Sequence, residues 1–209
     1  PNTITTIERG ALEDTLWYSQ FRGDFVFIND ILIEYRGMDR NVVIPENIRY
    51  ITANAFKDNN FIKTIEFSPD IQTLPYQTAY NCINLESIAL PENLIEIKEM
   101  AFMGCVSLEN IVFPESLETV APNAFENTKW LYNYIDDVVI INDILYKYKG
   151  KQQTLHIPNI IKKIGKEAFF ENTNLRDVYI PQSVEFIGES AFEGCSSLEY
   201  LQIEDNSQL

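Results

Sequence analysis

The residues best able to do chemistry in this chain of 209 residues are three cysteines and one histidine. Cys82, Cys105 and Cys195 form no close pair, which argues against a disulfide framework and against a Cys-x-x-Cys zinc site. Each stands three residues before an apolar L-x-x-I-x-I segment, where other copies of that segment have Asn or Thr. We therefore expect small side chains that hydrogen-bond the backbone inside a turn, rather than reactive thiols.

His156 lies in the segment Thr154-Leu-His-Ile157-Pro158, at an outward strand position, and no Ser or Cys triad can be assembled around it. The chain has no phosphate-binding Gly-rich loop and no D-x-D-x-D-G calcium loop. Paired acids such as Asp136-Asp137 are interpreted as solvated loop charge, with adventitious calcium as the alternative. The sequence thus predicts no catalytic, cofactor-binding or metal-binding residue, and we do not expect an enzyme.

Composition excludes some classes of partner. Sixteen Lys and Arg against 31 Asp and Glu give a formal net charge of −15, which disfavours nucleic acid and anionic membranes. Hydrophobic residues make up 45% of the chain, enough for a continuous core. No apolar stretch approaches the ~18 residues of a membrane helix, so we expect no direct membrane insertion.

An internal repeat organises the chain. Alanine followed by a bulky apolar residue recurs, and a proline lies eleven residues before the second member of each pair. The pairs are Ala11-Leu12, Ala55-Phe56, Ala79-Tyr80, Ala101-Phe102, Ala124-Phe125, Ala168-Phe169 and Ala191-Phe192. Seven coincidences at one spacing indicate stacked units of one kind.

Each unit also contains L-x-x-I-x-I, whose central residues Ile65, Ile88 and Ile111 are 23 apart. The pattern predicts a short strand in one parallel sheet, followed by an aliphatic pair in a turn that drops a side chain inward. The pattern predicts that the second unit is slipped: an extra residue near Pro75 is offset by one lost after Tyr80. We therefore expect locally altered structure there.

A larger repeat relates residues 17–56 to residues 130–169 with a constant offset of 113. Each copy inserts about 21 residues, and Asn29-Asp30 and Asn142-Asp143 lie between β-prone runs, which predicts hairpins with two-residue turns. Trp17 and Trp130 open the inserts and are interpreted as packing staples, with an aromatic ligand platform as the alternative.

These features predict one solenoid domain over residues 1–209. It is built from two related halves, 1–113 and 114–209, with hairpin inserts near 17–40 and 130–153. A solenoid end exposes apolar faces unless something covers it. We therefore expect either a fragment of a longer chain or ends covered by a partner or by atypical residues.

The unit Ile180-Pro-Gln-Ser-Val-Glu-Phe-Ile-Gly-Glu-Ser-Ala-Phe-Glu-Gly-Cys-Ser-Ser-Leu198 resembles the BspA-like leucine-rich repeats of bacterial surface proteins. The resemblance covers nearly the whole chain and includes the N-D-I-L hairpin insert. It implies an α/β, β-rich, right-handed leucine-rich-repeat solenoid with a parallel sheet along one face. It also implies secretion, cell-surface display and a role in adhesion or other protein contacts, and it carries over no catalytic residue. The chain departs from the pattern at Leu12, where an aromatic residue is usual, and in the second unit.

The residues that flank the central apolar residue of each strand should point away from the core and form two stripes along the sheet. One stripe is expected to contain Val43, Glu66, Ala89, Val112, His156, Tyr179 and Gln202. The other is expected to contain Asn41, Thr64, Ser87, Asn110, Thr154, Asp177 and Tyr200.

Aromatic residues gather at one end of these stripes. We take His156, Tyr179, Tyr200, Asp177 and Gln202 as candidate ligand-binding residues, because tyrosine is enriched among interface hot spots. The alternative is that cross-strand tyrosines only stabilise the sheet. The resulting hypothesis is a cell-surface module that binds a protein or glycoprotein, and the alternative is a structural spacer or assembly domain.

Overall fold

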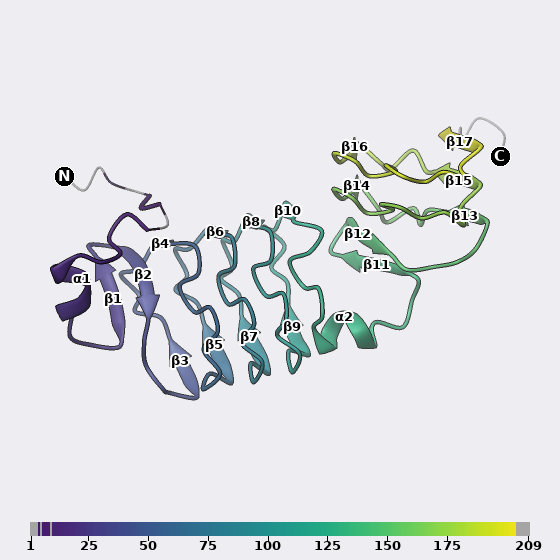
Figure 1. Ribbon diagram of the computed structural model, residues 1–209. Coiled ribbons are helices and arrows are strands. Elements are labelled where there is room, and N and C mark those ends of the chain that lie inside the picture. Colours follow the sequence, from purple (N-terminus) through teal and green to yellow (C-terminus); the bar gives the residue numbers. More distant parts are fainter. Residues whose placement is uncertain (1–3, 5, 9, 204–209) are drawn as a thin grey trace. The chain divides into compact units, whose positions relative to one another are not determined.

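The computed structural model describes residues 4, 6–8 and 10–203. The chain forms two compact units, residues 1–133 and residues 134–209, which are described separately (Figure 1). The two sequence halves meet at residues 113 and 114, whereas the compact units meet at residues 133 and 134. The expectation about the chain ends concerns residues that lie largely outside the described part.

In unit 1 the L-x-x-I-x-I segments form a parallel sheet, as the sequence predicts. Its order is β3-β5-β7-β9, and consecutive strands pair residues 23 apart, such as Ile65 with Ile88. The central residues Val42, Ile65 and Ile88 are buried while their neighbours face outward. The strands are β3 (Asn41–Val43), β5 (Thr64–Glu66), β7 (Ser87–Ala89) and β9 (Asn110–Val112).

The aliphatic pairs do more than turn the chain. The second residue of each pair belongs to a two-residue strand, and these short strands form further parallel ladders, so the expectation of one parallel sheet is wrong. A coil crosses the solenoid twice, and each crossing can hydrogen-bond to the next coil. The strands are β4 (Tyr50–Ile51), β6 (Thr73–Leu74), β8 (Glu96–Ile97) and β10 (Thr119–Val120).

Both predicted hairpins are present. The strands β1 (Phe25–Ile28) and β2 (Ile31–Tyr35) pair antiparallel, as do β11 (Val138–Ile141) and β12 (Ile144–Tyr148). The first turn residue, Asn29 or Asn142, has a left-handed φ of 54° or 53°. Asparagine tolerates that conformation, which matches the twist of a tight hairpin. Each hairpin joins the short-strand side of its unit, because β2 pairs with β4 and β12 pairs with β14.

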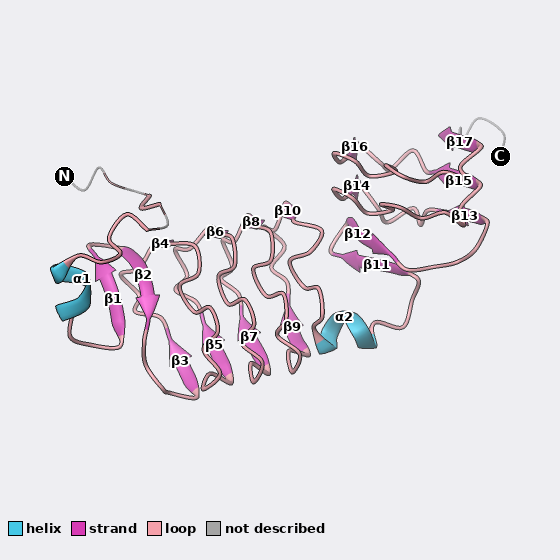
Figure 2. Ribbon diagram, viewed as in Figure 1, coloured by secondary structure: helices cyan, strands magenta, loops and turns pink. Residues whose placement is uncertain are grey.

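Unit 2 repeats the arrangement with fewer coils (Figure 2). One parallel sheet has the order β13-β15-β17, and the hairpin continues into a second sheet of order β11-β12-β14-β16. The long strands are β13 (Thr154–His156), β15 (Asp177–Ile180) and β17 (Tyr200–Ile203). The short strands are β14 (Lys163–Ile164) and β16 (Phe186–Ile187).

The helices α1 (Leu16–Gln20) and α2 (Lys129–Asn133) carry the two tryptophans. The Trp130 ring packs 5.4 Å from the Phe113 ring and 5.3 Å from the Phe125 ring, so it is the predicted staple between insert and solenoid. Trp17 is 43% exposed and contacts Phe21 within its own insert, with ring centroids 5.5 Å apart. The staple prediction is therefore confirmed for Trp130 only.

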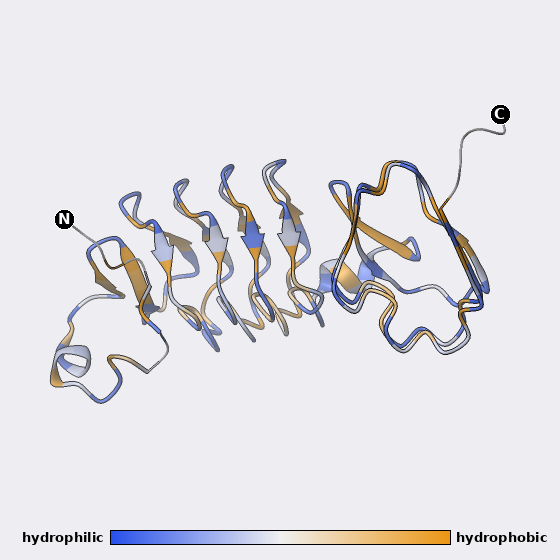
Figure 3. Ribbon diagram, turned by 90° about the horizontal axis from the view of Figure 1, so that it is seen from above, coloured by the Kyte–Doolittle hydropathy of each residue, from blue (hydrophilic) through white to orange (hydrophobic). Residues whose placement is uncertain are grey.

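Aromatic rings form the centre of both cores, and hydropathy alternates along the coils of each unit (Figure 3). Phe102 and Phe125 are fully buried and stack at 5.4 Å, with an angle of 8° between their planes. Phe169 is buried and stacks on Phe192 at 4.6 Å. Phe192 is half-buried because it lies in the last described coil.

The predicted slip in the second unit is wrong. The amide of Phe56 donates to the Thr78 carbonyl (2.8 Å), and the amide of Ala79 donates to the Ala101 carbonyl (2.7 Å). Ala79 therefore occupies the place that Phe56 and Phe102 hold in their coils, and the 23-residue register continues unbroken. The ring of Phe67 fills the space, with its centroid 6.4 Å from those of both phenylalanines. Tyr80 follows an alanine, as the core phenylalanines do, and this similarity is the reason that the sequence predicts a slip.

Candidate functional site

The exposed face of the β13-β15-β17 sheet brings the five candidate residues together. His156 pairs with Tyr179 and Tyr179 with Gln202, while Asp177 pairs with Tyr200 in the neighbouring column. The intervening Leu155 and Val178 are buried beneath them. Side chains alternate between the faces of a strand, so all five candidates project from one surface, as the sequence predicts.

The aromatic rings on this face form a ladder, which is defined here as His156, Tyr179 and Tyr200. The His156 and Tyr179 rings are stacked, with centroids 4.3 Å apart and planes within 5° of parallel. The Tyr200 ring lies 6.1 Å from that of Tyr179, tilted by 54°. Stacked rings have few free rotamers and present a rigid, largely apolar surface with polar tips.

Polar groups surround the ladder. The Tyr200 hydroxyl donates to Oε1 of Gln202 (3.1 Å), and the Thr154 hydroxyl donates to Oδ2 of Asp177 (3.2 Å). The sequence interpretation missed one neighbouring feature, an ion pair between Arg176 Nη2 and Glu199 Oε2 at 2.7 Å. Opposite charges 23 residues apart were the available signal, since that spacing places residues side by side on adjacent strands.

The corresponding face of unit 1 has a different character. Its outward columns contain no aromatic side chain, and the Thr64 hydroxyl donates to Oδ1 of Asn41 (3.1 Å) on the neighbouring strand. An ion pair between Lys63 and Glu86 occupies the place that Arg176 and Glu199 hold in unit 2. Val43 and Val112 are its exposed large apolar residues, at 60% and 83% exposure. The expected stripes of seven residues are divided in two, because β9 ends one sheet and β13 begins another. The second insert lies between those strands in the sequence.

The cysteines occupy turns, as predicted. Cys82 Sγ donates to the Phe56 carbonyl (2.9 Å), Cys105 Sγ to the Ala79 carbonyl (3.0 Å) and Cys195 Sγ to the Phe169 carbonyl (3.1 Å). In each case the acceptor belongs to the preceding coil, so the thiol ties two coils together. A hydrogen bond with Cys82 and burial raise the pKa of Cys105, and burial raises the pKa of Cys195. A raised pKa keeps a thiol protonated and poorly nucleophilic.

Among the described residues, no group of three or more His, Cys, Asp or Glu side chains is placed to hold a metal ion. Asp136 and Asp137 are both exposed. No helix in residues 4, 6–8 and 10–203 is long and apolar enough to cross a membrane.

Comparison with known proteins identifies the repeat. The family model described as BspA type leucine rich repeat region matches residues 35–140 and 139–208, with six copies. A T. pallidum leucine-rich-repeat protein is similar at 28% identity over 82% of this chain and 72% of that chain, with a TM-score of 0.46. A leucine-rich-repeat protein from Bacteroides ovatus is 25% identical over 76% of this chain and 47% of that chain, with a TM-score of 0.45. A comparison with curated proteins finds no match.

Proposed function

This chain belongs to the BspA-type leucine-rich-repeat family, and from that membership we propose that it is a non-catalytic binding module of a bacterial cell-surface protein. Its partner in this proposal is a protein or glycoprotein met outside the cell. Repeat solenoids present extended surfaces whose scaffold positions are fixed while the outward positions vary. The outward positions are therefore where a partner would be recognised.

The single observation that carries the proposal is the aromatic ladder. A spacer needs only an evenly hydrated surface, yet Tyr200 is 50% exposed on the same face as His156 and Tyr179. Interface centres are rich in tyrosine and are surrounded by polar groups that exclude water. Asp177, Gln202 and the Arg176–Glu199 pair supply such a rim.

The contrast with unit 1 supports the same assignment. Both long-strand sheets use the same scaffold and register, so sheet stability alone does not call for tyrosine at these positions. The sheet of unit 1 pairs Thr64 with Ser87 where the sheet of unit 2 pairs Asp177 with Tyr200. The excess of aromatic surface on unit 2 is the specific feature that distinguishes a binder from a spacer.

The test is a binding survey by surface plasmon resonance with the whole chain. The probes are purified extracellular-matrix and plasma glycoproteins, each immobilised separately. We expect saturable binding to at least one, and at least a tenfold loss of affinity, about 1.4 kcal/mol, in the Tyr179→Ala/Tyr200→Ala variant.

The matched control is Tyr132→Ala, which removes a tyrosine that is 87% exposed on α2. It should bind as the wild type does. Absence of binding to every probe would favour the structural-spacer hypothesis. Equal affinity of the Tyr179→Ala/Tyr200→Ala variant and the wild type would show that the partner binds at another surface.

A further inference from the structure

The short-strand side of unit 1 is interrupted at one place, between β4 and β6. At other coil junctions the first residue of the short strand donates its amide to the preceding coil, as Glu96 does to the Gln72 carbonyl (3.1 Å) and Thr119 to the Ile95 carbonyl (3.1 Å). Within the described residues, the amides of Gln72 and Thr73 have no such partner, and β4 and β6 belong to different sheets.

Proline explains part of the interruption. Lys98 and Ala121 each close their junction by donating an amide hydrogen bond of 2.9 Å, to Leu74 and Ile97 respectively. The corresponding position in the second coil is Pro75, which has no N–H. The hydrogen bond that would join the end of β6 to the preceding coil is therefore absent. Backbone groups of β4 and β6 remain available to a ligand.

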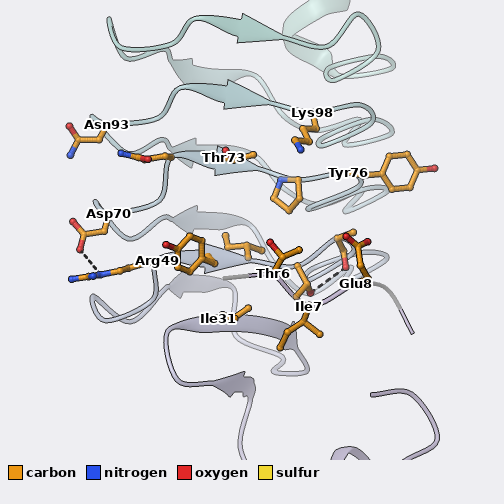
Figure 4. Close-up of a pocket in the computed structure, with 16 residues that line it drawn as sticks. Thr6, Ile7, Glu8, Ile31, Arg49, Asp70, Thr73, Tyr76, Asn93 and Lys98 are labelled. Carbon is orange, nitrogen blue, oxygen red and sulfur yellow. Dashed lines mark hydrogen bonds and ion pairs between the residues drawn. The ribbon is translucent and has the colours of Figure 1, made fainter. Parts of the chain in front are cut away.

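A groove of about 740 Å³ lies over this interruption. That volume is within the range of small-molecule sites, roughly 300–1,000 Å³. Arg49, Asp70 and Asn93 lie toward one end of the groove and Tyr76 toward the other, and residues 6–8 form part of its border (Figure 4). Tyr50, Gln72, Thr73 and Lys98 also line it.

The lining specifies the chemistry of an occupant. Tyr50 and Tyr76 are each 38% exposed and offer partly apolar rings, while Gln72, Thr73 and Asn93 offer amide and hydroxyl groups. Arg49 pairs with Asp70 at 3.4 Å and Lys98 pairs with Glu96 at 3.7 Å, and Glu8 also lines the groove, so the groove has no excess positive charge for an anion. A fitting ligand is neutral, rich in hydroxyl groups and partly apolar on its ring faces.

A whole peptide strand does not fit between β4 and β6. The two coils stay in direct contact on both sides of the interruption, through Asn54 N to the Tyr76 carbonyl (3.2 Å) and Ser68 Oγ to the Glu46 carbonyl (3.2 Å). An added strand needs about 4.8 Å of separation from each neighbour, which these bonds do not allow. Hydroxyl groups can reach the open amides and carbonyls from above, because each can both donate and accept.

We propose that this groove binds a neutral oligosaccharide, with sugar rings against Tyr50 and Tyr76 and hydroxyls on Gln72, Thr73 and Asn93. The site is separate from the aromatic ladder, which belongs to unit 2. It therefore gives the chain a glycan-binding activity besides the protein contact proposed above, and either activity can fail without the other.

The test uses the whole ¹⁵N-labelled chain and amide chemical shifts. The probes are maltotriose, xylotriose, triacetylchitotriose and N-acetyllactosamine at millimolar concentration, with a heparin hexasaccharide as the anionic comparison. We expect at least one neutral probe to shift the amides of Gln72 and Thr73. Tyr76→Ala and Gln72→Ala should each lower the affinity for that probe by about tenfold. Tyr132→Ala should not.

The variants concern exposed side chains, and preserved dispersion of the amide spectrum verifies their fold. The proposal is overturned if no neutral probe moves the Gln72 and Thr73 amides, or if only the heparin hexasaccharide does. It is equally overturned if the shifts centre on His156, Tyr179 and Tyr200, or if Tyr76→Ala and Gln72→Ala bind as the wild type does.

Discussion

At the scale of single residues, the tightest packing occurs where each hairpin returns to the solenoid. The motifs Tyr35-Arg-Gly37 and Tyr148-Lys-Gly150 place a buried tyrosine directly against a buried glycine. A Cβ atom on Gly150 would lie 2.3 Å from Oη of Tyr148, and Gly37 has the same relation to Tyr35. These glycines are required for space, since neither has a left-handed φ.

We predict that Gly150→Ala destabilises the fold by about 1–3 kcal/mol, because the buried tyrosine must move to admit the methyl group. Gly37→Ala should act in the same direction. The measurement is chemical denaturation, with the exposed neighbour change Lys151→Ala as the control. Equal midpoints for Gly150→Ala and Lys151→Ala would show that the tyrosine is free to move.

The cysteines give a second prediction at this scale. Cys195 is half-buried, whereas Cys82 and Cys105 have no exposed surface. In the native chain iodoacetamide should modify Cys195 first, and Cys82 and Cys105 only after denaturant is added. Because burial raises the pKa of Cys195, its thiolate fraction at mildly alkaline pH is smaller than that of a free thiol.

Mass spectrometry of timed samples identifies the modified residue, with N-acetylcysteine as the rate standard. Cys195 should react more slowly than the standard, and its rate should keep rising at pH values where the standard has levelled off. Early modification of Cys82 or Cys105 would contradict their assigned place between coils.

At the scale of elements, each coil is specified by a few inward residues, and the second coil shows how one substitution is offset by another. Ala79 replaces the core phenylalanine, and Phe67 supplies the missing ring. Phe67 occupies the place that Ile44 and Leu90 hold in neighbouring coils. The larger side chain at position 67 therefore fills the volume that the smaller Ala79 leaves in the same coil.

A double-mutant cycle tests this exchange. Phe67→Leu should cost about 1–3 kcal/mol through lost volume, and Ala79→Phe a similar amount through overpacking. The double variant restores the arrangement of the neighbouring coils and should cost less than the sum of the single changes. Thermal or denaturant unfolding gives the three values, and simple additivity would mean that the two positions do not share a space.

The same coil shows which features the sequence can predict. Spacing alone predicts the strands and their pairing, because residues 23 apart must stack once the coils have equal length. The two hairpins follow equally from Asn29-Asp30 and Asn142-Asp143. The register of the second coil is not predicted correctly, because the sequence does not show whether Ala79 or Tyr80 takes the inward position of the core phenylalanines. The packing around Phe67 decides between these two registers.

The candidate ladder was predictable for a similar reason. Alternation places His156, Tyr179 and Tyr200 outward, and the spacing places them on neighbouring strands. Their stacking geometry was not predictable, since it depends on side-chain rotamers. The groove over Pro75 was not predicted, because the sequence was interpreted only as having an extra residue near Pro75, and the missing N–H of this proline was not considered.

At the scale of the whole molecule, the residues that maintain the scaffold differ from those proposed for recognition. Buried phenylalanines, turn thiols and hairpins maintain the coils, while the outward residues of unit 2 supply aromatic surface. The formal charge of −15 affects association at long range, since it attracts partners with basic patches and slows the approach of acidic partners. Salt should therefore change association rates more than dissociation rates.

The central claim is that a partner contacts the chain through His156, Tyr179 and Tyr200. Hydroxyl-radical footprinting of the wild-type chain, alone and with a glycoprotein found in the binding survey, tests it without any mutation. We predict that Tyr179 and Tyr200 lose reactivity in the complex while Tyr132 retains it. Unchanged reactivity of Tyr179 and Tyr200 in a saturated complex, with protection appearing at other residues, would contradict it.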